Sequence, residues 1–324
     1  MLRRSLRAIL QYGGLLLVVV VVNFALPRLA PGTATDYILP PSQSGTLTPQ
    51  QNHQLLAEFG LDKSTAVQFE RYVMSLAHGD LLYSFRLRQP VKDVITGRIG
   101  WTALLVGLSI ILSTLFGTVV GFRSAWKRGR SGDVAVLGSA MLVNSTPPFF
   151  VGLLLILAFS VDLHWFPIYG ALPPSGLRGL ALLAAGARRL VLPLVTLTLA
   201  RLGGLYLVAR SSLVSELRED YVLMARAKGL DARAVRRHAE RNALMPVATD
   251  TLIEIGTMVG GAVVVETVFS YPGLGRLIYD SVLSRDYPVL QGVFLVLAIG
   301  VILANLAGDL LYPLLDPRVR SGGR

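Results

Sequence analysis

Long apolar runs separated by short polar segments dominate the pattern along this chain. Trp101–Phe122 is the clearest run, because it carries no charged residue. A helix needs about 20 apolar residues to cross ~30 Å of hydrocarbon. The pattern therefore predicts an all-α membrane protein. The six predicted transmembrane helices are Ala8–Leu26, Trp101–Phe122, Val134–Val161, Leu190–Ala209, Val247–Val268 and Val289–Tyr312.

Composition supports this interpretation. Hydrophobic residues make up 52% of the chain and charged residues only 16%, whereas a soluble domain typically has about 25% charged residues. A cleaved signal peptide is the alternative for the first run. That run exceeds the usual ~7–15 apolar residues, and no small-residue cleavage site follows it. We therefore predict an uncleaved first helix.

The net charge of +11 could indicate either nucleic-acid binding or membrane topology. The basic residues flank the apolar runs and form no separate basic domain, which favours topology and no nucleic-acid partner. The segments predicted to be cytoplasmic hold eighteen Lys and Arg residues, and the short outside segments 162–189 and 269–288 hold five. We therefore expect both termini in the cytoplasm.

The chain divides into three predicted parts. Residues 1–30 form the N-terminal tail and first span. Residues 31–98 form an extracytoplasmic loop, partly helical around Thr48–Phe59 and Thr65–Leu76. Residues 99–324 form a core of five spans, in which Gly117 and Gly121 provide a face of small residues for close helix packing.

The third predicted span is interrupted by Asn144, Ser145, Thr146, Pro147 and Pro148. Two prolines cannot both fit an unbroken helical hydrogen-bond ladder. Freed backbone groups at membrane depth must face protein or water. This break is either a structural kink or a feature that lines a pathway, with Asn144, Ser145, Thr146 and Pro147 as the candidates.

Several ionisable residues lie in the predicted spans. Each costs about 2.5–3.5 kcal/mol at a helix centre, so each should face the bundle interior, a partner or water. Arg201, Glu254 and Asp309 are candidates for interior positions, whereas Asp250 and Glu266 lie close enough to span ends to reach the interface. Arg201 and Glu254 either line a pathway or pair between helices.

Residues 210–246, between the fourth and fifth spans, are too polar to cross a membrane. Helix formers fill Leu213–Lys228, and Gly229 follows where a left-handed C-terminal cap is needed. Asp231 can cap a second helix that begins near Ala232, and Pro246 marks where that helix gives way to the fifth span. The segment predicts a basic helix–turn–helix, either an ordinary surface hairpin or a docking arm.

This segment resembles the cytoplasmic EAA loop of dipeptide and oligopeptide ABC transporter permeases. Further matches continue to the C-terminus in the same order, and Gly60-Leu61-Asp62-Lys63 and His78-Gly79-Asp80-Leu81 resemble the family's first outside loop, so the resemblance covers essentially the whole chain. The matching residues are Glu219-Asp220-Tyr221, Ala225-Arg226-Ala227-Lys228-Gly229-Leu230, His238-Ala239, Arg241-Asn242-Ala243, Glu266-Thr267-Val268-Phe269-Ser270, Tyr271-Pro272-Gly273-Leu274-Gly275-Arg276, Arg285-Asp286-Tyr287-Pro288 and Asp309-Leu310-Leu311-Tyr312.

The resemblance implies a type I ABC importer permease fold in the bacterial inner membrane. It also implies a second homologous permease subunit, two ABC ATPase subunits and an extracytoplasmic substrate-binding protein as partners. The EAA loop of that family inserts a coupling helix into the ATPase. Carried over to this chain, the coupling residues are Glu219, Asp220, Ala225, Arg226, Ala227, Lys228, Gly229, Leu230 and Asp231. The implied substrates are di- and oligopeptides, with nickel chelates, glutathione or another small solute as alternatives.

Some positions depart from the family pattern. Leu223 and Met224 replace the Glu and Ala of the general consensus, and Glu240 replaces an apolar residue. Arg201 is unusual, and Glu254 stands where the family pattern leads us to expect Gln. The changes inside the spans bear on substrate, which the sequence alone leaves open.

A membrane-embedded hydrolase and a channel or scaffold are the other classes considered. The four His form no HExxH spacing, no Ser/His/Asp set is evident, and no GxxxxGK[ST] loop is present. The chain has no Cys, which excludes thiol chemistry. We predict no catalytic, metal or cofactor site. A channel would leave the helix–turn–helix unexplained.

Overall fold

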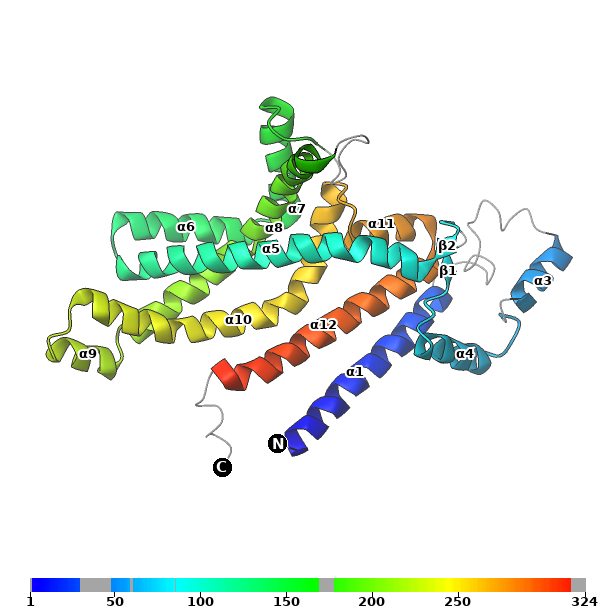
Figure 1. Cartoon of the computed structure of the whole chain (residues 1–324), viewed down its shortest axis with the longest axis horizontal. Coiled ribbons are helices and arrows are strands. Elements are labelled where there is room, and N and C mark those ends of the chain that lie inside the picture. Colours follow the sequence, from blue (N-terminus) through cyan, green and yellow to red (C-terminus); the bar gives the residue numbers. More distant parts are fainter. Residues whose placement is uncertain (1, 30–47, 59–60, 85, 169–177, 316–324) are drawn as a thin grey trace. The chain divides into compact units, whose positions relative to one another are not determined.

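The computed structural model describes residues 2–29, 48–58, 61–84, 86–168 and 178–315, nearly all of them helical (Figure 1). The end of the helix predicted at Thr48–Phe59 and the C-terminal residues from 316 lie outside the described residues. The helices are α1 (Leu2–Leu29), α3 (Pro49–Glu58), α4 (Thr65–Ala77), α5 (Val91–Trp126), α6 (Ser131–Ser145), α7 (Pro148–Leu155), η2 (Ile156–Asp162), α8 (Gly179–Glu216), α9 (Asp220–Ala227), α10 (Ala232–Val268), α11 (Leu274–Ser284) and α12 (Tyr287–Leu315).

The chain folds as two compact units. One comprises Met1–Thr102 and Pro272–Leu303, and the other comprises Ala103–Tyr271 and Ala304–Arg324. Both α5 and α12 therefore contribute one end to each unit.

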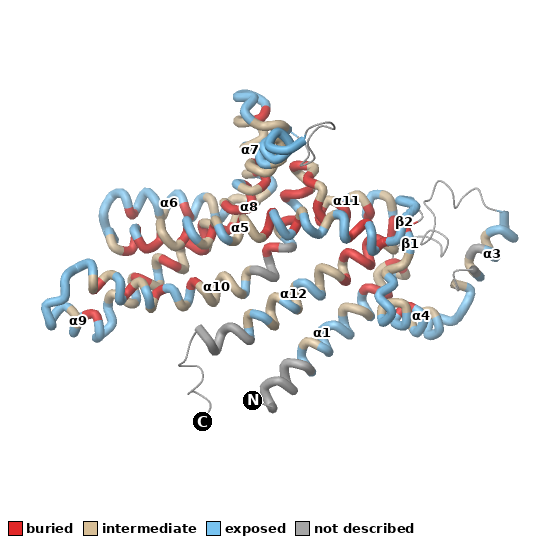
Figure 2. The backbone as a smooth tube through the Cα atoms, in the orientation of Figure 1, coloured by how far each residue is buried: buried red, intermediate tan, exposed pale blue. Residues whose placement is uncertain are grey.

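The first unit is held by polar contacts between distant segments. A two-stranded antiparallel hairpin joins β1 (Tyr83–Ser84) to β2 (Gln89–Pro90). The buried Ser84 hydroxyl donates to Asp286 at 2.5 Å. Asn23 of α1 donates to the Gln291 carbonyl at 2.7 Å, and the Gln291 side chain donates back to the Asn23 carbonyl at 2.8 Å. Elsewhere α1 is mostly exposed along its described side chains (Figure 2), as expected of a surface helix in lipid.

In the second unit α8 packs against α10, α6 and α7, and two glycines of α5 also approach it closely. A Cβ added at Gly121 would lie 2.8 Å from the Ala209 Cβ and 2.9 Å from the Tyr206 carbonyl oxygen. One added at Gly117 would lie 3.1 Å from Leu205. The small-residue face predicted at these two glycines is therefore confirmed as a helix contact.

Among the described residues, four helices are long and apolar enough to cross a membrane: α1, α5, α8 and α12. The bent pair of Ser131–Ser145 and Pro148–Asp162 could supply one more span. The fifth predicted span lies in the 37-residue α10, which is not among these four and is not described at every side chain. Asp250, Glu254 and Glu266 lie within that stretch, so crossing by α10 stays a prediction.

Two predicted boundaries are wrong. The sequence predicts an outside loop, rich in Pro and Gly, over Leu163–Arg189, but the helix α8 already begins at Gly179. The other error concerns Pro246, which does not end the preceding helix, because α10 runs through it without a break. Proline removes only one ladder bond, and the buried neighbours Ala243 and Val247 anchor the helix on both sides.

Candidate coupling elbow and intramembrane ion cluster

The segment from Leu217 to Asp231, here called the elbow, connects α8 to α10 through the short helix α9. Gly229 has a φ of +76°, the left-handed conformation predicted for a C-terminal cap. The Asp231 side chain accepts a 2.8 Å hydrogen bond from the Ala234 amide and caps α10. Both capping predictions are confirmed by these contacts.

The first helix of the elbow differs from its prediction. Helix formers predict one helix over Leu213–Lys228, but α8 ends at Glu216 and α9 begins at Asp220. Glu219 is extended, with φ −70° and ψ 147°. This bend places the Val222 side chain in the core, where it is fully buried, so tertiary burial overrides local helix propensity.

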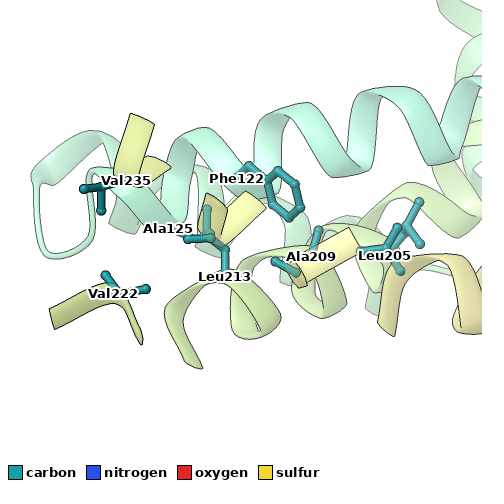
Figure 3. Packing of buried hydrophobic residues seen from close by; sticks show 10 residues of the cluster. Phe122, Ala125, Leu205, Ala209, Leu213, Val222 and Val235 are labelled. Carbon is teal, nitrogen blue, oxygen red and sulfur yellow. The ribbon is translucent and has the colours of Figure 1, made fainter. Parts of the chain in front are cut away.

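The elbow rests on a compact apolar cluster (Figure 3). Small and β-branched side chains let the helices approach closely. The cluster comprises Phe122 and Ala125 of α5, Leu205, Ala209 and Leu213 of α8, Val222 of α9, and Val235, Ala239, Ala243 and Val247 of α10. The Ser212 hydroxyl also donates to the Ala243 carbonyl at 3.0 Å. Motion of the elbow is thereby tied to both α8 and α10.

Two polar contacts lie beside the elbow, one within the first turns of α10 and one between α9 and the end of α8. The Arg236 guanidinium pairs with Glu240 at 2.6 Å and lies 5.7 Å from the ring centroid of Trp126. This pair gives the unexpected Glu240 a structural role. The Tyr221 hydroxyl donates to Glu216, and partial burial with that hydrogen bond raises the pKa of Tyr221 to about 12. Tyr221 therefore remains a neutral donor at physiological pH.

The remaining coupling residues lie on the surface. Ala225 packs partly against the cluster, whereas Glu219, Asp220, Arg226, Ala227, Lys228, Gly229, Leu230 and Asp231 are exposed. Leu223 and Met224 are also exposed, at 56% and 58%. The elbow therefore presents apolar side chains among charged ones of both signs.

An ion pair between Asp133 and Arg210, here called the ionic pin, joins the start of α6 to the last turns of α8. Arg210 donates two hydrogen bonds to Asp133, at 2.9 and 2.8 Å, in a bidentate arrangement. Asp133 also accepts from the Ser124 hydroxyl and from the Gly129 amide. Ser124 in turn contacts the Tyr206 hydroxyl at 2.6 Å.

Sequence reasoning missed this pin. The available signal was that Asp133 is the one acidic residue in the basic segment 123–133. A lone carboxylate among arginines at the start of a helix suggests a specific partner.

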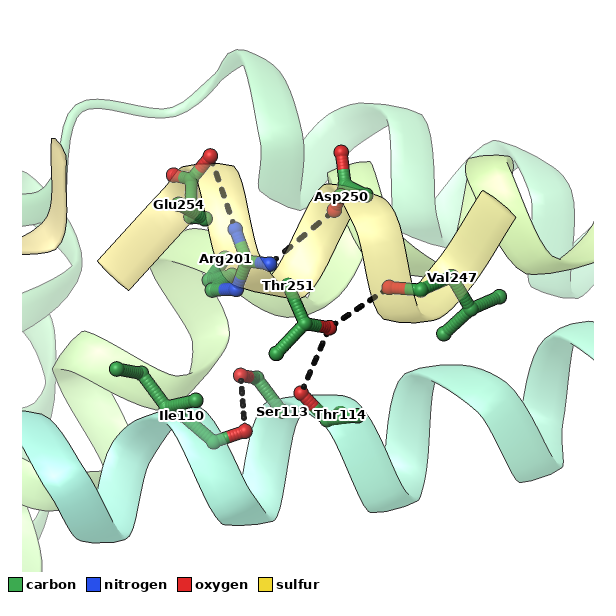
Figure 4. Close-up of polar contacts among 8 residues, drawn as sticks. All are labelled: Ile110, Ser113, Thr114, Arg201, Val247, Asp250, Thr251 and Glu254. Carbon is green, nitrogen blue, oxygen red and sulfur yellow. Dashed lines mark hydrogen bonds and ion pairs between the residues drawn. The ribbon is translucent and has the colours of Figure 1, made fainter. Parts of the chain in front are cut away.

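An ion cluster lies between α8 and α10 (Figure 4). The Arg201 side chain is only 5% exposed and pairs with Asp250 at 3.1 Å and Glu254 at 3.0 Å. The pairing between helices considered for Arg201 and Glu254 is thus present. Asp250 belongs to the same cluster, although the sequence assigned it to the interface. Glu266, also assigned there, is fully buried, and Asp309 is exposed.

The predicted break in the third span is present. Thr146 is extended after α6 ends, Pro148 occupies the first turn of α7, and the two arms bend by 104°. Asn144, Ser145 and Pro147 are exposed and Thr146 is half-buried. A Cβ added at Gly203 of α8 would lie 2.8 Å from the Asn144 Cβ, so the break is fixed against α8.

The long apolar helices, the bent span and the elbow define a polytopic helical membrane protein with an exposed helical arm between α8 and α10. Residues 113–321 match the family described as the binding-protein-dependent transport system inner membrane component. The chain belongs to this family and is an inner-membrane permease component of such a transport system.

Curated relatives match nearly the full chain. A di/tripeptide transport system permease of Pseudomonas aeruginosa strain UCBPP-PA14 is 37% identical, covering 93% of this chain and 94% of the relative. A dipeptide transport system permease of Escherichia coli K12 is 35% identical, with the same coverage. A putative peptide transport system permease of Brucella abortus strain 2308 is 36% identical over 97% of this chain and 98% of its own length.

A solved structure gives the fold. The match is to an inward-facing MetNI methionine ABC transporter, with a TM-score of 0.56 and 19% identity over 69% of this chain and 97% of the matched chain. The ABC importer permease fold predicted from sequence is therefore confirmed.

Proposed function

We propose that this chain is one of two permease subunits that form the pathway of an ABC importer for di- and oligopeptides. The 35–37% identity to dipeptide and di/tripeptide permeases over 93% of the chain carries this proposal. Two ATPase subunits, a substrate-binding protein outside and a second homologous permease complete the transporter. The same proposal includes the division of the chain into a first span (1–30), an extracytoplasmic loop (31–98) and a core (99–324). It also places both termini in the cytoplasm.

In this mechanism the elbow docks onto an ATPase subunit through Ala225–Asp231 and the flanking Glu219 and Asp220. Exposed Leu223, Met224 and Leu230 supply apolar contact area, and the basic side chains supply charge. ATP-driven closure pushes the elbow. Because its apolar cluster includes residues of α8 and α10, the push moves both helices and opens the pathway.

The proposed pathway face includes the break at Asn144, Ser145, Thr146 and Pro147 and the cluster of Arg201 and Glu254. Exposed polar groups at membrane depth must face water or another subunit. The break and the carboxylate of Glu254 have such exposure in this single chain. A membrane hydrolase has no comparable support.

Reconstitution tests the substrate. The complete transporter, with its binding protein, is placed in proteoliposomes and given labelled dipeptides, with ATP omitted in a matched control. We expect the labelled dipeptide to accumulate only when ATP is present. Unlabelled peptides should reduce this accumulation by competition, whereas glutathione and nickel chelates should not. Accumulation of a different solute with no peptide uptake would overturn the peptide assignment.

A further inference from the structure

The ion cluster of Arg201, Asp250 and Glu254 holds two carboxylates against a single guanidinium. The group therefore has a net charge of −1 with all three ionised. The positive partner is buried at 5% exposure, whereas the two carboxylates are 33% and 36% exposed. The cluster therefore presents its negative side outward.

The direction of that exposure is fixed by α10. Thr251 faces α5, where its hydroxyl lies 3.4 Å from that of Thr114. Asp250 and Glu254 project on the other side of the helix in Figure 4. Next to them along α10, Ile253 is 62% exposed. The carboxylates thus lie beside an exposed position of the helix, where contact with lipid would cost several kcal/mol.

The face of α8 that carries Arg201 also holds unsatisfied polar atoms. Among the described residues, Arg201 Nε and Thr198 Oγ1 are buried without a hydrogen-bond partner. Thr198 and Arg201 are three positions apart, so they share a face of α8. Thr198 is only 7% exposed. A buried donor without an acceptor costs about 1–3 kcal/mol, so each of these two atoms could take one more hydrogen-bond partner.

We infer that this cluster is a subsite for the amino-terminal end of the transported peptide. Asp250 and Glu254 receive the terminal ammonium group, and Arg201 holds the two carboxylates in place. The adjacent peptide carbonyl is an acceptor of the kind that Arg201 Nε and the Thr198 hydroxyl lack. The inference rests on the proposed peptide function and adds the part of the substrate that this subunit recognises.

The test uses the complete reconstituted transporter with Asp250→Asn, Glu254→Gln and Glu254→Asp. Each is supplied with a tripeptide or its N-acetylated form at equal occupancy of the binding protein. Peptide imported per ATP hydrolysed is measured for both. Asp280→Asn is the matched control, because Asp280 pairs with Arg276 at 3.0 Å within one turn and is 44% exposed.

Loss of one charge-assisted contact should lower import of the free-amino tripeptide per ATP about tenfold in the Asn and Gln variants. Import of the N-acetylated peptide, already slow, should stay unchanged. Asp280→Asn should retain most of the wild-type value, and Glu254→Asp, which keeps the negative charge, should lose less than Glu254→Gln. Equal effects on both peptides, or none, would overturn the inference, and loss of subunit assembly would assign the cluster to a contact with the second permease. Absence of peptide uptake in the wild type would instead refute the proposed function.

Discussion

Replacing Gly203 by alanine should destabilise the protein by about 3 kcal/mol, at the upper end of overpacking effects. The new Cβ would lie 2.6 Å from the Ala140 carbonyl oxygen and 2.8 Å from the Asn144 Cβ. The Ala140 carbonyl belongs to the backbone, and the Asn144 Cβ is bonded directly to the backbone of α6. Neither atom can therefore rotate away from the new methyl group. We expect α8 to separate from α6 beside the bend at Thr146.

Gly138→Ala is the matched control in α6, because nothing lies within 4 Å of a Cβ there. Alanine normally stabilises a helix relative to glycine by about 0.5–1 kcal/mol. The two substitutions should therefore change thermal stability in opposite directions, as measured by unfolding of the purified protein in detergent. Equal stability of the two variants would show that the α6–α8 contact is looser than described.

Replacing Asp133 by asparagine should cost on the order of 3 kcal/mol, as expected when one partner of a buried ion pair is removed. The side chain of Asp133 is 3% exposed and that of Arg210 is 18% exposed. Asparagine cannot accept the bidentate pair, so a charged guanidinium would remain partly buried without its counterion. The measurement is thermal unfolding of the single and double variants.

The double variant Asp133→Asn with Arg210→Gln should recover part of the loss, because it leaves no unpaired charge. Arg210→Lys should be intermediate, since lysine cannot form the planar two-pronged contact. Additive losses in the double variant would mean that the two residues do not act as a pair. Transport should fall together with stability, because the pin fixes α8 beside the elbow.

Local signals predicted the local structure of the elbow. Gly229 needs a left-handed conformation and Asp231 needs a free helix N-terminus, and both requirements depend only on neighbouring residues. The bend before Asp220 carries no such signal, because its residues are ordinary helix formers. Burial of Val222 decides that bend, and burial depends on helices distant in sequence.

The ion pairs were partly predictable. Asp250 and Glu254 are four positions apart, which places both on one face of a helix, and Arg201 in an apolar run requires a partner. The partner of Arg201 depends on how α8 is aligned against α10. Arg201 and Asp250 are 49 residues apart in the sequence, so local patterns do not identify this pair. Asp133 and Arg210 are 77 residues apart, so only the packing of α6 on α8 identifies that pair.

We propose that the elbow is cytoplasmic and docks onto the ATPase. The chain has no cysteine, so single cysteines report position without background. We predict that Lys228→Cys at the exposed elbow tip cross-links to the ATPase subunit in the assembled transporter. It should be protected from a membrane-impermeant maleimide added outside, while Glu70→Cys in the exposed part of α4 should react with that reagent and not cross-link. Outside labelling of Lys228→Cys, with no cross-link to the ATPase, would contradict this account.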